Sequence, residues 1–195
     1  QALAPTPRGT TPGGGGGPDD GWRVEDDPEG SGIGAGHSAG VGFGYDLGAG
    51  EYDPAGNRVW AQRYNGPAND EDGGFAGRSL GVDPLGNVVV GGYSTGVGTG
   101  YDWVVVKYSP GGALLWEDRI ASFGGNGTDA CWGIAIDPSG EIYAGGDFSG
   151  VSRDVLVVKY DANGEHLWKD QYDGPAGGGE WFYDIAIDSA GNVAA

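Results

Sequence analysis

The sequence predicts an all-β fold, a β-propeller built from four-stranded antiparallel blades. One phrase recurs along the chain, as DPLGNVVVGGYSTG at 83–96, DPSGEIYAGGDFSG at 137–150 and DSAGNVAA at 188–195. Its leading aspartates are 54 and 51 residues apart, and residues 27–46 align with 83–102 at an offset of 56. A period near 50 residues with strand-like content is typical of propellers. The chain therefore holds about three and a half repeats of 51–56 residues.

Each complete repeat is expected to contain four strands joined as two hairpins. In the clearest repeat, residues 131–138 and 141–148 flank a turn at Asp137, and residues 154–160 and 165–172 flank a turn at Asp161. Both turns have the pattern D-x-x-G followed by Asn or Glu, which is typical of a type I turn that closes with glycine in the left-handed region. A variant at 109–113, SPGGA, keeps the pattern with serine in first place.

The strand faces predict how the sheets pack. The first strand alternates large and small residues, and the third strand, as in VLVVKY at 155–160, is apolar on both faces. The fourth strand is polar around one tryptophan, at Trp60, Trp116 or Trp168, as expected of an outer edge. We therefore expect a partial propeller over 21–195, with blades at about 22–65, 76–121 and 131–173 and a half-blade at 181–195. Residues 1–20 are rich in Gly and Pro and are expected to be a linker or a decayed strand.

The first repeat departs from the others at four positions. It has Gly32, Gly34, Gly48 and Gly50 where the next repeat has Val88, Val90, Val104 and Val106. Each change needs only one base, so two hypotheses stay open, a decaying repeat or sequence errors. If the glycines are real, the lost burial makes this the least stable repeat.

Composition excludes several classes of partner. The net charge of −18 and the pI near 4.1 have the wrong sign for nucleic acid or an anionic membrane surface. No apolar stretch is long enough to insert into a membrane. The single cysteine, Cys131, cannot form an internal disulfide and is expected in the core.

Three phrases resemble a known bacterial repeat. DWVVVKYSPGGALLW at 102–116, DVLVVKYDANGEHLW at 154–168 and YDGPAGGGEWFYDIAIDSAGN at 172–192 resemble the SBBP repeat, the "seven-bladed β-propeller" repeat. The resemblance implies a secreted or cell-surface bacterial protein of uncharacterised function, although no signal peptide is visible here. It also implies that further repeats of the parent chain complete the propeller.

Acidic residues recur in the connections between blades and are the candidate metal ligands. Asp129 and Glu180 lie eight residues before a leading aspartate, and a longer loop displaces the corresponding acid run to Asp70–Asp72. Ca²⁺, which prefers oxygen ligands, is the one candidate ion, with Asp72, Asp129 and Glu180 as ligands. The alternative is that these carboxylates accept backbone N–H bonds within the connections. No other cofactor is expected.

Residues that do not follow the period are the candidates for a binding surface. They are Asp70, Glu71, Trp103, Trp181 and Asp184. No catalytic residues are expected, because the G-x-S-x-G matches at 36–40 and 92–96 follow hairpin strands and precede no helix. The prediction is a non-catalytic scaffold that binds an unknown protein or glycan. The alternatives are a propeller hydrolase or lyase with a site in the central channel, and a structural spacer in a large surface protein.

Overall fold

The computed structural model describes residues 20–27, 30–39, 44–74, 78–122, 127–149, 152–175, 178–188 and 191–195. Strands and turns make up this part of the chain, and no helix occurs in it, which confirms the all-β prediction. A membrane-spanning helix is accordingly not found among these residues. Residues 1–19, most of the expected linker or decayed strand, lie outside the described residues.

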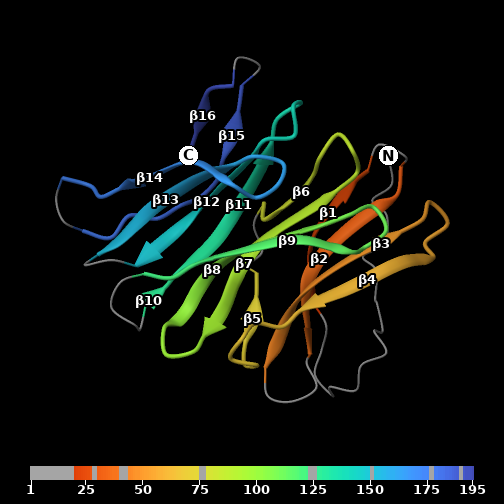
Figure 1. Cartoon of the computed structure of the whole chain (residues 1–195), viewed down its shortest axis with the longest axis horizontal. Coiled ribbons are helices and arrows are strands. Elements are labelled where there is room, and N and C mark those ends of the chain that lie inside the picture. Colours follow the sequence, from red (N-terminus) through yellow and green to blue (C-terminus); the bar gives the residue numbers. More distant parts are fainter. Residues whose placement is uncertain are drawn as a thin grey trace.

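The strands form successive antiparallel sheets in chain order (Figure 1). The first sheet contains β1 (Asp20–Asp26), β2 (Gly32–Ala39), β3 (Tyr45–Tyr52) and β4 (Arg58–Tyr64). The second contains β6 (Leu80–Val82), β7 (Val88–Gly96), β8 (Gly100–Tyr108) and β9 (Leu114–Ile120). The third contains β11 (Ala130–Ile136), β12 (Ile142–Ser149), β13 (Arg153–Tyr160) and β14 (His166–Tyr172). The short pair β15 (Ala186–Ile187) and β16 (Val193–Ala194) begins a fourth.

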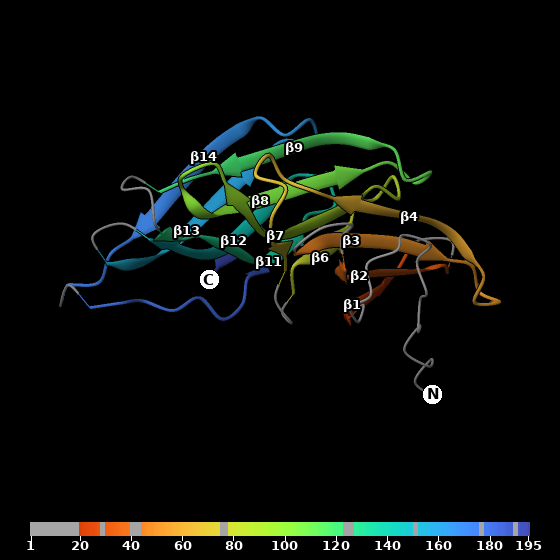
Figure 2. The ribbon, with the colours of Figure 1, turned by 90° about the horizontal axis from the view of Figure 1, so that it is seen from below.

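Two very short strands join the connections between sheets to the second sheet. β5 (Asp72–Gly73) pairs antiparallel with β7, and β10 (Gly127–Thr128) pairs parallel with β8. Figure 2 shows β4, β9 and β14 on one side of the molecule and β1 on the opposite side. Each sheet therefore runs from an inner first strand to an outer fourth strand, as the strand faces predict.

The recurrent turns form as expected from their sequence. At the second repeat, the Asp83 carboxylate accepts the backbone N–H groups of Leu85 and Asn87, each at 2.9 Å. Gly86 has φ of 77°, a conformation that glycine adopts without steric cost. Because the long strands of each sheet pair antiparallel with their neighbours, all these turns lie at one end of the sheets. We call this the turn end and the opposite end the variable end.

Among the described residues, apolar cores lie between neighbouring sheets, and a small third one joins Tyr143 of the third sheet to Phe182 and Ile185. The first joins Ile33, Leu47 and Trp60 of the first sheet to valines of β7 and β8. The second joins Trp103 and Val105 of β8 to residues of the third sheet, Cys131 among them. Cys131 is 0% exposed, as expected of a core side chain, and this burial raises the pKa of its thiol.

The four glycines of the first repeat lie on the face of the first sheet that points away from the second sheet, which we call its outer face. Their counterparts in the second repeat, Val88, Val90, Val104 and Val106, face the first sheet and belong to the core between the two. The glycines thus occupy the face that points away from the second sheet. The glycines therefore remove side chains from the outer face of the first sheet. The core between the first and second sheets is unaffected.

Candidate functional site

The variable end carries different side chains at equivalent positions of the three sheets. In the first sheet the rings of His37 and Tyr45 are in tilted contact with centroids 4.4 Å apart, and in the second Tyr93 and Tyr101 are in similar contact at 4.6 Å. The same two positions in the third sheet hold an ion pair, in which Arg153 Nη1 lies 3.5 Å from Asp147 Oδ2. The backbone positions are thus equivalent in the three sheets, whereas the side chains at these positions differ in their chemistry.

Glu71 is held between the two tyrosines of the second sheet. Tyr93 Oη donates to Glu71 Oε1 at 2.9 Å, and Tyr101 Oη donates to Glu71 Oε2 at 2.8 Å. Burial, followed by the hydrogen bond to Glu71, raises the pKa of Tyr93, and the hydrogen bond to Glu71 is the main cause of the raised pKa of Tyr101. Both phenols therefore stay protonated and act as donors. Asp70 beside them is exposed.

The two tyrosines were not among the residues predicted from the sequence. Their signal is the comparison of repeats, because Tyr93 and Tyr101 stand where the third repeat has Asp147 and Arg153. Where the side chain differs between repeats although the strand pattern is the same, that side chain does not have one packing role common to all repeats. A search for such positions finds this cluster.

Asp72 and Asp129 are fully buried and bind backbone groups. Asp72 accepts the N–H of Gly66 at 2.6 Å and of Thr95 at 3.2 Å, and Asp129 accepts the N–H of Ser122 at 2.7 Å and of Ser149 at 2.6 Å. Burial raises the pKa of both carboxyls, although these hydrogen bonds act in the opposite direction. Each carboxylate thus fastens a connection between sheets to the end of the next second strand, the alternative role considered for these residues.

Glu180, at the equivalent place after the third sheet, lies in a different environment. Oxygens of Asp154, Asp173 and Glu180 lie within 4.8 Å of one another. Asp154 is buried, and Glu180 Oε2 is a buried atom without a hydrogen-bond partner among the described residues. Sequence reasoning identified Glu180 but missed the other two.

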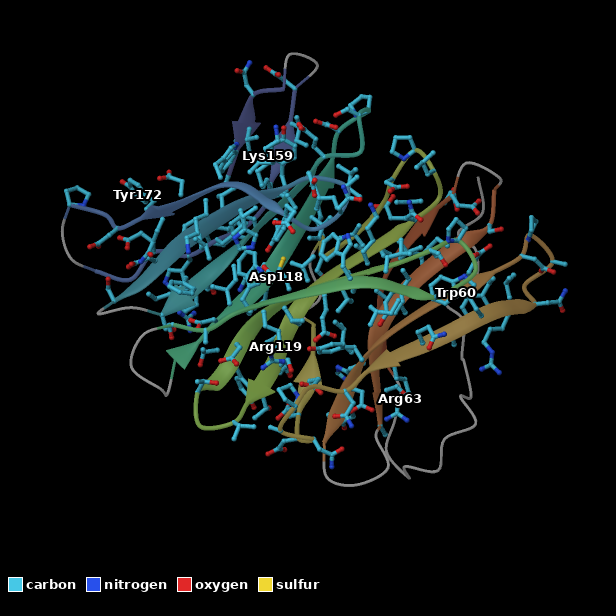
Figure 3. All side chains as sticks on the ribbon, viewed as in Figure 1. Trp60, Arg63, Asp118, Arg119, Lys159 and Tyr172 are labelled. Carbon is cyan, nitrogen blue, oxygen red and sulfur yellow. The ribbon has the colours of Figure 1, made fainter. Side chains whose placement is uncertain are left out.

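The loss of one arginine distinguishes this group from the other two sheets. Arg63 pairs with Asp46 in the first sheet, and Arg119 Nη2 lies 2.8 Å from Asp102 Oδ2 in the second (Figure 3). The third sheet has Gln171 instead, whose Nε2 donates to Asp154 Oδ2 at 2.5 Å. Three carboxylates without the repeat's arginine form a group that could hold a divalent cation.

Of the remaining predicted residues, Trp181 and Asp184 line one pocket beside the third sheet, and Trp103 lies elsewhere. The expectation that Trp103 belongs to a binding surface is wrong, because its side chain is 0% exposed and fills the core between the second and third sheets. Trp181 is 62% exposed, and Arg153 Cζ lies 4.2 Å from the centroid of its ring. Asp184 Oδ2 is 3.4 Å from Arg78 Nη1. Glu71 and Trp181 belong to different junctions between sheets and do not form one pocket.

Comparisons with known proteins agree with the fold. Residues 86–114 and 138–165 match a family model described as "Domain of unknown function (DUF5122) beta-propeller". The structure is similar to the crystal structure of a protein of unknown function from Bacteroides caccae, with a TM-score of 0.52 and 15% sequence identity. That alignment covers 90% of this chain and 52% of the other, so the chain spans about half the length of that protein. No curated protein matches the chain.

Both segments matched by the family model cover equivalent parts of the second and third repeats. Together with the four-stranded sheets, they support a β-propeller fold for this chain. The solved structure, at its low identity, supports the fold alone.

Proposed function

We propose that this chain is a non-catalytic binding scaffold, part of a secreted or cell-surface bacterial propeller of the SBBP type, whose variable end binds a protein or a glycan. The supporting observation is that the two ends of the sheets differ in how far their side chains are repeated. Aspartates that recur in every repeat form the turns of the turn end. Equivalent positions of the variable end hold a pair of aromatic rings in contact, a glutamate bound by tyrosines or an ion pair. Variable positions on a rigid scaffold are where binding residues are concentrated.

The chemistry of the variable end suits a polar or cationic ligand. Tyr93 and Tyr101 hold Glu71 in one orientation, so this carboxylate loses little conformational freedom when it accepts a hydrogen bond from a ligand. The exposed ring of Trp181 offers a face on which a sugar ring or an apolar side chain could stack. The net charge of −18 disfavours anionic partners.

A glycan and peptide array probed with the whole chain tests this proposal. Any ligand found is then titrated against Glu71→Gln and Trp181→Ala, with Leu85→Ala as the control, since Leu85 is 80% exposed at the turn end. We expect at least one variable-end substitution to weaken binding about tenfold, the loss of one good contact, and the control to bind normally.

Three results would overturn the proposal. An array without any ligand favours a structural spacer, and a ligand that is cleaved favours the hydrolase or lyase alternative. Weakening by Leu85→Ala alone would place the site at the turn end.

We further propose that Asp154, Asp173 and Glu180 bind Ca²⁺. The supporting observation is that this sheet replaces the repeat's arginine by Gln171 and leaves a buried oxygen of Glu180 without a hydrogen-bond donor among the described residues. Carboxylate and amide oxygens are the ligands that Ca²⁺ prefers. Asp72 and Asp129, whose oxygens accept backbone N–H groups, are not included.

Melting curves in Ca²⁺ and in chelator test the ion site, because an ion that binds only the folded state raises the melting temperature. We expect a higher melting temperature in Ca²⁺ for the wild type and a reduced response for Asp173→Asn. Gln171→Arg, which restores the arginine of the other sheets, is the matched variant and should abolish the response while keeping the chain folded in chelator. Superimposable wild-type curves would disprove the site.

A further inference from the structure

Glu71 is fixed in both its backbone and its side chain. Its carbonyl oxygen accepts the backbone N–H of Thr95 at 3.1 Å and also the Thr95 hydroxyl group. The next two residues form β5, which pairs with β7 (Figure 1). The phenols of Tyr93 and Tyr101 hold the carboxylate. The position of Glu71 is therefore set before a ligand arrives.

Glu71 has no cationic partner among the residues that the structure describes. Asp46 and Asp102, which lie at the same end of the sheets, pair with Arg63 and Arg119. The oxygens of the Glu71 side chain accept hydrogen bonds from the two phenols and form no ion pair with a described residue. These bonds use two of the roughly four acceptor positions of a carboxylate. Because Glu71 is only half-buried, a ligand can reach the others.

The third repeat shows that the second sheet has gained an acid and lost a base at this place. Glu71 and Thr128 are equivalent, because each directly precedes the buried aspartate of its connection and accepts a side-chain hydroxyl at its backbone oxygen. Tyr101 is equivalent to Arg153, since each directly precedes the recurrent aspartate of its third strand. Relative to the third sheet, the second therefore has one more negative charge and one fewer positive charge here.

The third sheet also shows how a guanidinium is held at this position. Arg153 Nη1 lies 3.5 Å from Asp147 Oδ2, and Arg153 Cζ lies 4.2 Å from the centroid of the Trp181 ring. A planar guanidinium can stack on an aromatic ring and donate to a carboxylate at the same time. The second sheet presents the same two kinds of group, the Glu71 carboxylate and the Tyr101 ring, without a guanidinium.

We propose that Glu71 and Tyr101 bind the guanidinium of an arginine side chain on a protein ligand. The guanidinium lies over the exposed part of the Tyr101 ring and donates to the free acceptor positions of Glu71. Asp70 is exposed next to Glu71 and adds a second negative charge, which attracts the guanidinium and repels the α-carboxylate of free arginine. The inference rests on the binding role proposed above for the variable end and narrows its ligand to one chemical class.

Arginine blocked at both ends, as acetyl-arginine-methylamide, is the probe. NMR titration of the whole chain at about 0.15 M salt, where non-specific attraction to the acidic surface is screened, measures its affinity. We expect saturable shifts of the Glu71 and Tyr101 amide signals. Blocked citrulline, which has a similar shape without the charge, should bind at least tenfold more weakly.

Two further probes identify the chemistry and its source. Blocked lysine should bind more weakly than blocked arginine, because an ammonium group cannot stack on the ring and donate bidentately. Free arginine should also bind more weakly, because its carboxylate faces Asp70. Equal binding of blocked lysine would contradict a guanidinium site, and tighter binding of free arginine would contradict a protein ligand.

Tyr101→Arg restores the arginine of the third sheet and is the matched variant. Its guanidinium is expected to pair with Glu71 and to weaken binding of blocked arginine at least tenfold, with a melting temperature no lower than that of the wild type. Glu71→Gln, which still accepts a phenol hydrogen bond but lacks the charge, should weaken binding about tenfold. Glu117→Gln removes a negative charge from an exposed position of β9 and should bind normally.

Equal affinities for arginine and citrulline would overturn the inference, and so would equal weakening by Glu71→Gln and Glu117→Gln, which indicates non-specific attraction. The two proposals for the variable end can fail separately. An array ligand without a cationic group, bound normally by Glu71→Gln, would support the scaffold and disprove the arginine site. An array without a ligand, together with a titration without shifts, would disprove both.

Discussion

Lys107 shows how one residue can join three parts of the molecule. Its Nζ lies 2.9 Å from Asp83 Oδ2, with both side chains 2% exposed, and donates to Ala162 O of the third sheet at 3.1 Å. The equivalent Lys159 pairs with Glu141 at 2.5 Å, with side chains 17% and 36% exposed. Equal positions in the repeat thus carry interactions of unequal energy, because burial decides how much an ion pair contributes.

Lys107→Ala is expected to destabilise the chain by about 3–5 kcal/mol, because it leaves the buried Asp83 carboxylate without its cationic partner. Lys159→Ala, the matched variant, should cost less than about 1 kcal/mol. Urea unfolding of both variants measures the difference. Equal losses for the two lysines would contradict this account.

The pH dependence of stability should have opposite signs at two aspartates. Burial acts to raise the pKa of Asp83, but hydrogen bonds from Asn87 and Lys107 outweigh it and hold the pKa below its usual range. Its contribution is therefore complete above the unfolded pKa of about 3.9 and is lost as the pH falls through the lower folded value. Asp129 has a raised pKa, so its contribution is greatest below about 3.9 and declines as the pH rises through the folded value.

Urea midpoints of the wild type, Asp83→Asn and Asp129→Asn measure these contributions between pH 2 and pH 7. The advantage of the wild type over Asp83→Asn should grow with pH, and its advantage over Asp129→Asn should shrink. Parallel curves for the three proteins would show that neither carboxyl has a shifted pKa.

At the scale of the element, the repeat predicts strands and hairpins well and the short connecting strands poorly. The D-x-x-G turns form from contacts over four residues, such as the bond from Asn87 N to Asp83 Oδ1. β5 and β10 have two residues each and exist only because they pair with β7 and β8 of the second sheet. Such pairing depends on where the sheets come to lie, which local sequence does not encode.

The glycines of the first sheet give a prediction at this scale. A Cβ atom at Gly48 would meet nothing closer than 3.5 Å, whereas one at Gly92 would lie 2.1 Å from the carbonyl oxygen of Gly73. Gly48→Ala should therefore stabilise the chain by about 0.5–1 kcal/mol through lower unfolded-state entropy. Gly92→Ala should destabilise it, because β5 must move away.

Thermal melting of the two variants measures both effects. A Gly92→Ala variant that is more stable than the wild type would show that β5 can move away from residue 92 without loss of stability. A strongly destabilised Gly48→Ala would show that the outer face of the first sheet is closely covered.

At the scale of the whole molecule, large apolar side chains gather at the open junction after the third sheet. Trp168, Tyr172, Trp181 and Tyr183 are 41%, 57%, 62% and 89% exposed. A contiguous apolar surface beside an unpaired strand edge promotes association. This surface thus exposes the chain to self-association.

Sedimentation velocity should show concentration-dependent association of the chain. Trp168→Lys should reduce the association by placing a charge in this apolar surface, and Val59→Lys, at a residue 56% exposed on β4, serves as the control. A wild-type chain that stays monomeric over the whole concentration range would contradict this prediction.

The sequence by itself determined the period, the all-β class, the turns and the place of the outer tryptophans. These features depend on alternation and on contacts within a few residues, which repeat wherever the phrase repeats. Only the tertiary structure decided that Trp103 is core, that Glu71 binds two tyrosines, and that Asp154 and Asp173 join Glu180. Those groupings bring together residues from different strands and connections, so they follow from how one sheet packs against the next, which the periodic pattern does not specify.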